Sequence, residues 1–73
     1  MQVNYEDLAN AIIYQAVKDY RKACRRLKRN PKRLDAQAMK TDCEEFFRSK
    51  WYKDLTSIDG EELMMIIQRE GIA

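Results

Sequence analysis

Apolar residues recur every three or four positions through the N-terminal part of the chain, which is the repeat of an amphipathic helix. One row of them runs through Tyr5, Leu8, Ile12, Ala16, Tyr20, Ala23 and Leu27, with a second row beside it at Ala9, Ile13, Val17 and Cys24. Together the two rows form a stripe that is broad enough to face a core. We expect one helix over residues 4–29, capped by Asn4 and ended before Pro31, because proline cannot continue the helical hydrogen-bond ladder.

A second helix is predicted over residues 31–48. Asn30 is suited to cap this helix, and Pro31 is favoured at a first helical position. Its apolar residues again stand at helical spacing: Ala36, Met39, Cys43, Phe46 and Phe47. We therefore expect a hairpin of two long helices with its turn near Asn30.

The C-terminal part of the chain predicts a short helical turn and a third helix. The turn is expected over residues 50–55, and we expect Trp51 to close the core where the second and third helices meet. Asp59, followed three positions later by a glutamate, is close to a capping box and starts the third helix. Gly71 is suited to end that helix.

These elements predict an all-α fold, in which a helical hairpin, a short helical turn and a third helix form a small three- to four-helix bundle. The 73 residues include only two Gly and one Pro, so the chain has little material for turns. We expect a single domain over residues 1–73. A chain of this size buries only about 60% of its unfolded surface. A closed monomer and a symmetric homodimer are both compatible with the long apolar stripe.

The net charge of +2 conceals a strong segregation of charge along the chain. Residues 18–33 hold nine of the 14 basic residues and a single acid, Asp19. The segments on both sides of this stretch are mildly acidic. One end of the predicted hairpin is therefore strongly cationic.

Most of these cations lie away from the apolar stripe on the first helix and define what we call the basic face. Its candidate binding residues are Tyr14, Lys18, Arg21, Lys22, Arg25, Arg26, Arg29 and Arg33. A cationic strip with an aromatic residue is suited to a phosphate backbone, and an acidic protein surface is another candidate partner. The remaining alternative is a solvated face, partly neutralised by Asp42, Glu44 and Glu45. Sequence-specific DNA reading by the third helix is not expected, because its first turn is acidic.

The composition argues against catalysis and against bound metals or cofactors. The chain has no histidine, the usual acid–base group at neutral pH. Two isolated cysteines do not make a zinc site, and two glycines do not make a phosphate-binding loop. We expect no enzymatic activity, no metal and no cofactor.

Other patterns predict the compartment and the state of the cysteines. The longest apolar run, residues 63–67, is far too short to span a membrane, and acidic residues stand where a signal peptide would be positive. We expect a cytoplasmic protein with no membrane contact. We also expect Cys24 and Cys43 to be free thiols, since an offset of about 9 Å along the hairpin is too long for a disulfide.

Two stretches carry a resemblance to known proteins: residues 5–23 (YEDLANAIIYQAVKDYRKA), and the pair formed by residues 43–52 (CEEFFRSKWY) and 55–63 (LTSIDGEEL). Together they resemble small, largely uncharacterised proteins carried by phages and mobile elements of Gram-positive bacteria. The resemblance implies a non-catalytic protein that binds a host or defence protein, and an inhibitor of a defence nuclease is one function that fits. The alternative is an accessory protein that binds nucleic acid non-specifically.

Overall fold

The computed structural model of the chain describes residues 5–70, with side chains from Asp7 onward. This part contains four helices and no strand: α1 (Tyr5–Arg29), α2 (Leu34–Arg48), α3 (Lys50–Leu55) and α4 (Gly60–Glu70). The predicted all-α fold is confirmed. The predicted cap at Asn4 and the predicted stop at Gly71 lie outside the described residues.

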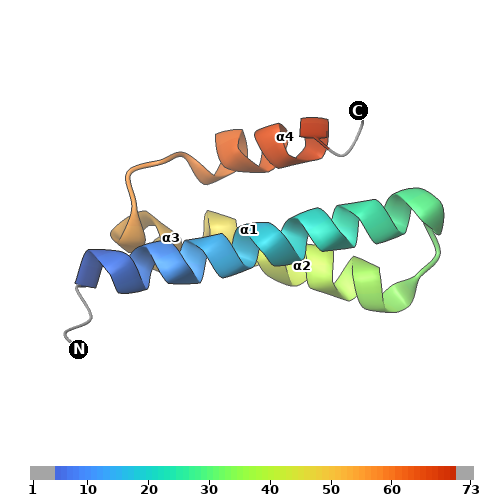
Figure 1. Ribbon diagram of the computed structural model, residues 1–73, viewed down its shortest axis with the longest axis horizontal. Helices are drawn as coiled ribbons and strands as arrows, with labels where there is room; N and C mark the ends of the chain where they lie inside the picture. The colour runs from blue at the N-terminus through green and yellow to red at the C-terminus, as the bar shows by residue number, and fades with distance from the viewer. Residues whose placement is uncertain (1–4, 71–73) are drawn as a thin grey trace.

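The helices form a hairpin with a third long element laid along it (Figure 1). α1 and α2 run antiparallel side by side, and α3 closes the open end of their hairpin. α4 then runs back along the hairpin and packs against both α1 and α2. Because α1 is about 37 Å long at the usual rise per residue, every other helix contacts it along some part of its length.

The turn between α1 and α2 is longer than predicted. α2 begins at Leu34, and its N-cap residue Arg33 makes no side-chain capping bond. Asn30 instead accepts a hydrogen bond through its side-chain oxygen from the backbone N–H of Lys32, at 3.2 Å. This local bond is the one that asparagine favours in turns. The prediction that Pro31 opens the second helix is therefore wrong, because Asn30 stabilises a turn rather than capping a helix.

An aromatic and aliphatic cluster from all four helices forms the core. Its fully buried side chains are Tyr20, Phe47, Tyr52, Met64 and Ile67. The rings meet edge-on, as aromatic quadrupoles favour: the centroid of Phe47 lies 5.7 Å from that of Tyr20 and 5.6 Å from that of Tyr52. This cluster is the point at which α1, α2, α3 and α4 converge.

Trp51 does not close the core as predicted. Its side chain is 55% exposed, while Tyr52 is buried in its place. The backbone explains why Tyr52 is buried and Trp51 is not. Ser49 is extended (φ −75°, ψ 158°), so α3 does not continue the helical repeat of α2, and residue 52 faces the core. The Trp51 ring still packs edge-on against the Phe46 ring, with the ring centroids 5.4 Å apart.

A glycine allows α4 to start directly against the end of α2. A Cβ atom at Gly60 would collide with the backbone carbonyl oxygen of Phe47. Asp59 stabilises this start, because its side-chain oxygen accepts a hydrogen bond from the backbone N–H of Glu61 at 3.2 Å. The predicted cap of the third helix is confirmed at Asp59, and Gly60 fixes how closely α4 approaches α2.

The predicted free thiols are confirmed, with Cys43 buried and Cys24 half-buried. Burial raises the pKa of both thiols, which keeps them protonated and unreactive. Across residues 5–70, no helix has the length and apolar character needed to cross a bilayer.

Candidate functional site

The structure brings four of the predicted binding residues together on α1. Lys18, Arg21, Lys22 and Arg25 line a shallow hollow of about 390 Å³, which we call the cationic hollow. They stand three or four residues apart, so their side chains leave the same side of the helix. This side is opposite the one that carries the buried residues Tyr20 and Ala23. The cationic hollow is therefore a consequence of the same periodicity that builds the core.

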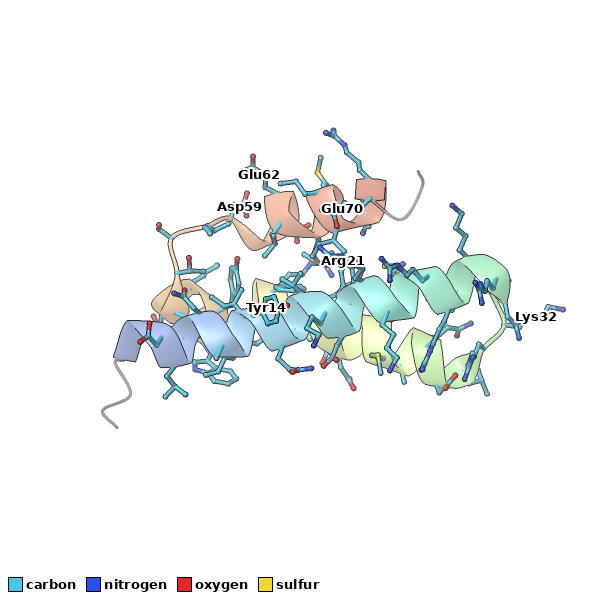
Figure 2. All side chains as sticks on the ribbon, viewed as in Figure 1. Tyr14, Arg21, Lys32, Asp59, Glu62 and Glu70 are labelled. Atoms are coloured by element: carbon cyan, nitrogen blue, oxygen red, sulfur yellow. The ribbon has the colours of Figure 1, made fainter. Side chains whose placement is uncertain are left out.

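Tyr14 extends this surface by one turn toward the N-terminus of α1. Its side chain is 65% exposed. The ammonium nitrogen of Lys18 lies 5.6 Å from the centre of the Tyr14 ring, within the range of a cation–π interaction. Tyr14 and Arg21 of this surface are labelled on α1 in Figure 2.

A carboxylate from α4 already occupies one edge of the cationic hollow. The guanidinium of Arg21 donates through Nε and Nη2 to the same oxygen of Glu70, at 3.0 and 2.7 Å. The two side chains point toward one another from neighbouring helices (Figure 2). Arg21 is thus shown in contact with the type of anion that an acidic protein surface presents.

Two other predicted binding residues, Arg26 and Arg33, contact Asp35 in the first turn of α2 instead. Arg33 donates to Asp35 at 2.8 Å, and Arg26 approaches the other oxygen of that carboxylate at 4.0 Å. The hydrogen bond from Arg33 lowers the pKa of Asp35, helped by the backbone N–H of Ala36. Arg29 is exposed in the last turn of α1. The structure therefore divides the basic face into the cationic hollow and a group near the hairpin turn.

Asp42, Glu44 and Glu45, the acids that could partly neutralise the basic face, form no direct ion pair with it in the described part of the chain. Glu44 accepts a hydrogen bond from the Tyr20 hydroxyl at 2.9 Å, within the bundle. Asp42 faces a groove between α1 and α2, and Glu45 is exposed. None of the three forms an ion pair within the described residues. Of the four cations of the hollow, Arg21 alone has a carboxylate partner within the described residues, and that partner is Glu70 of α4.

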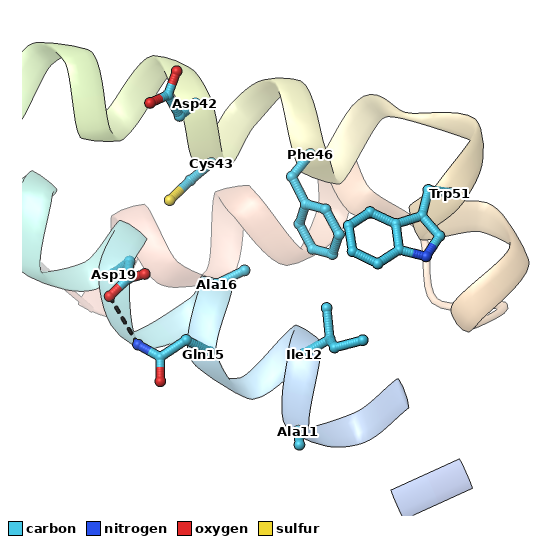
Figure 3. Close-up of a pocket in the computed structure, with 9 residues that line it drawn as sticks. All are labelled: Ala11, Ile12, Gln15, Ala16, Asp19, Asp42, Cys43, Phe46 and Trp51. Atoms are coloured by element: carbon cyan, nitrogen blue, oxygen red, sulfur yellow. Dashed lines mark hydrogen bonds between the residues drawn. The ribbon is translucent and has the colours of Figure 1, made fainter. Parts of the chain in front are cut away.

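A groove of about 470 Å³ between the helices was not predicted from the sequence (Figure 3). Its walls come from three helices: Ala11, Ile12, Gln15, Ala16 and Asp19 of α1, Asp42, Cys43 and Phe46 of α2, and Trp51 of α3. Most of these are apolar or small. The signal in the sequence was the pairing of small Ala11 and Ala16 with the large Phe46 and Trp51, but this pattern shows a groove only once the helix phases are known.

The arrangement can bind anions through guanidinium and ammonium groups, and it has an apolar surface nearby. Within residues 7–70, no cluster of three or more Cys, Asp or Glu side chains is placed to hold a metal ion. No protein-family model, curated protein or solved structure matches this chain.

Proposed function

We propose that this is a non-catalytic binding protein that docks onto an acidic protein surface through its basic face. The observation that carries the proposal is the Arg21–Glu70 contact, in which the cationic hollow already holds a carboxylate presented by a helix. The other three cations of the hollow, Lys18, Lys22 and Arg25, have no carboxylate partner within the described residues. They are available to the Asp and Glu side chains of a partner.

The setting of this interaction is part of the proposal. The resemblance of the sequence to phage and mobile-element proteins supports a host or defence protein as the partner, for which a nuclease is one example. Such an interaction would take place in the cytoplasm. The charge of the basic face would steer the two proteins together and orient them.

Nucleic acid is the second candidate partner, and one observation favours it. Tyr14 is exposed beside Lys18. Proteins that bind single-stranded nucleic acids combine aromatic rings, on which bases stack, with cations that contact the phosphates. In this case log affinity would fall steeply and linearly with log salt, because each phosphate contact releases a counterion.

A titration with labelled polymers tests both candidates. Fluorescence anisotropy would follow binding to poly-L-glutamate, to single-stranded DNA and to RNA over a range of salt. We expect poly-L-glutamate to bind at low salt, and the double variant Lys22→Glu/Arg25→Glu to weaken this binding at least about tenfold. The matched control is Lys53→Glu/Arg69→Glu, which makes the same change of charge on α3 and α4.

The outcomes separate the candidates. Binding that is stronger for nucleic acid than for poly-L-glutamate, with a steep salt dependence that the double variant reduces, would make nucleic acid the partner in place of an acidic protein surface. A loss of binding that is equal in the control variant would mean that only net charge matters. No binding of any polymer at low salt would contradict a polyanion-binding role for the basic face.

A further inference from the structure

The groove between α1 and α2 has an apolar floor and one acidic end. Ile12, Ala16 and Phe46 line its apolar part, and the end away from Trp51 has Asp19 on α1 and Asp42 on α2, with Cys43 between them (Figure 3). Cys43 lies between the helices at that end, 8% exposed. Burial, with contributions from the Asp19 and Asp42 carboxylates, raises the pKa of Cys43 to about 11.

Large apolar side chains are exposed along this same side of the molecule. Trp51 forms the outer wall of the groove and is 55% exposed. Leu8 is 50% exposed and precedes Ile12 by one helical turn, so it continues the line of the groove. A chain of 73 residues has a small core, and proteins of this size often gain stability by association.

Asp19 and Asp42 of the groove carry a charge opposite to that of Lys50, the exposed residue that directly precedes Trp51 in the chain. Asp42 has no ion pair in the described part of the chain, and Asp19 accepts a hydrogen bond only from the amide of Gln15, at 3.0 Å. Lys50 is exposed, directly precedes Trp51 in the chain and likewise forms no ion pair within residues 7–70. One molecule thus carries an apolar groove that ends in two carboxylates, and an exposed tryptophan beside a cation.

We propose that a second copy of this chain covers the groove. The two copies form a twofold dimer in which Trp51 of each packs into the groove of the other, and Lys50 of each faces Asp19 and Asp42 across the interface. A twofold axis near the centre of the groove makes both contacts twice, because an isologous interface is self-complementary. The two α1–α2 hairpins then form an antiparallel four-helix arrangement.

The proposed dimer uses none of the residues of the cationic hollow, because the groove and the hollow share no lining residue. The dimer does not depend on the proposed function, and each can fail without the other. If both hold, each dimer presents two cationic hollows.

Sedimentation velocity of the full chain, from low micromolar to near-millimolar protein, tests the dimer. We expect the unmodified protein to dimerise, and Trp51→Ala to weaken the dimer at least about tenfold, as for a central interface tryptophan. Lys50→Glu and Asp42→Lys should each weaken it, and the double variant Lys50→Glu/Asp42→Lys should dimerise more tightly than either single variant. Leu34→Ala is the control, because Leu34 is 77% exposed at the start of α2 and takes no part in the groove.

Three results would overturn the proposal. The first is a monomer at every concentration, which would leave the groove to a different protein. The second is a dimer that Leu34→Ala weakens as much as Trp51→Ala does. The third is a double charge reversal that binds no better than the single ones. Circular dichroism shows whether each variant is folded, and Lys50→Glu keeps the test valid if Trp51→Ala unfolds, because Lys50 is exposed.

Discussion

At Tyr20, one hydroxyl group connects three helices. It donates to Glu44 of α2 at 2.9 Å and accepts from the amide of Gln68 of α4 at 2.7 Å, while its ring is fully buried. A buried hydroxyl with both partners satisfied stabilises a particular arrangement of the helices, because any shift leaves a polar group unpaired. The apolar spacing of α1 predicted the burial of Tyr20, but no pattern in the sequence indicated its two polar partners.

The alkaline stability of the protein should depend on this residue. Burial, with a contribution from Glu44, raises the pKa of Tyr20 from 10.0 to about 12. The folded state therefore favours the neutral phenol, so its contribution is complete below pH 10.0 and is lost as the pH rises through about 12. The loss should amount to about 2 kcal/mol.

Urea unfolding at several alkaline pH values measures this effect. Tyr20→Phe should show a shallower fall of unfolding free energy, although Cys43 and Tyr52, whose pKa values are also raised, keep part of the slope. The same variant should lose about 1 kcal/mol at neutral pH, through the two missing hydrogen bonds. Tyr14→Phe, at an exposed site, is the control. An unchanged slope in Tyr20→Phe would contradict the assignment.

Gly60 provides a second prediction at the level of one residue. In an ordinary helix, Gly→Ala gains about 1 kcal/mol of stability. Here Gly60→Ala should lower the free energy of unfolding by about 2 kcal/mol or more, because the new methyl group meets the backbone of Phe47 and forces α4 away from α2. Thermal and urea unfolding show directly whether Gly60→Ala raises or lowers the free energy of unfolding. A variant as stable as the unmodified protein would mean that the two helices do not approach this closely.

Among the elements, α1 is the one that the sequence predicts best. Its apolar stripe is long and uninterrupted, and its predicted end at Arg29 is confirmed. α2 was predicted to start too early, because Asn30 and Pro31 are suited equally to a helix start and to a turn. The exposure of Trp51 was not predictable, because one extended residue, Ser49, changes the helical phase between α2 and α3. Periodicity describes a helix well, but it does not carry across a break in the helix.

Ser49 stabilises the junction between α2 and α3. Its hydroxyl donates to the backbone oxygen of Phe46 at 2.6 Å and accepts from the backbone N–H of Tyr52 at 3.1 Å, so it ends α2 and caps α3 together. Ser49→Ala should cost about 1 kcal/mol, the usual value for a lost cap. Urea unfolding measures it, with Ser57→Ala in the exposed segment between α3 and α4 as the control. Equal stability of the two variants would contradict the double role of Ser49.

At the scale of the whole molecule, the binding surfaces were only partly predictable. The helical repeat was sufficient to place Tyr14 and the four cations of the hollow on one side of α1. The separation of Arg26 and Arg33 from them depends on Asp35, whose position follows from the unpredicted turn. The groove depends on which side chains of α1, α2 and α3 face one another. For α3 this was predicted incorrectly, because Trp51 was expected in the core.

If the basic face docks onto an acidic surface as proposed, the ion pair between Arg21 and Glu70 affects which surfaces it can bind. Glu70 belongs to the same chain, so it competes for Arg21 at a fixed effective concentration that dilution does not lower. A weakly acidic surface fails this competition, whereas a dense array of carboxylates succeeds. Glu70→Gln should therefore increase the affinity for poly-L-glutamate about two- to fivefold, the scale of one exposed ion pair, while Glu62→Gln should not. Under the proposed function, α4 would thus set a threshold of charge density that a partner must exceed.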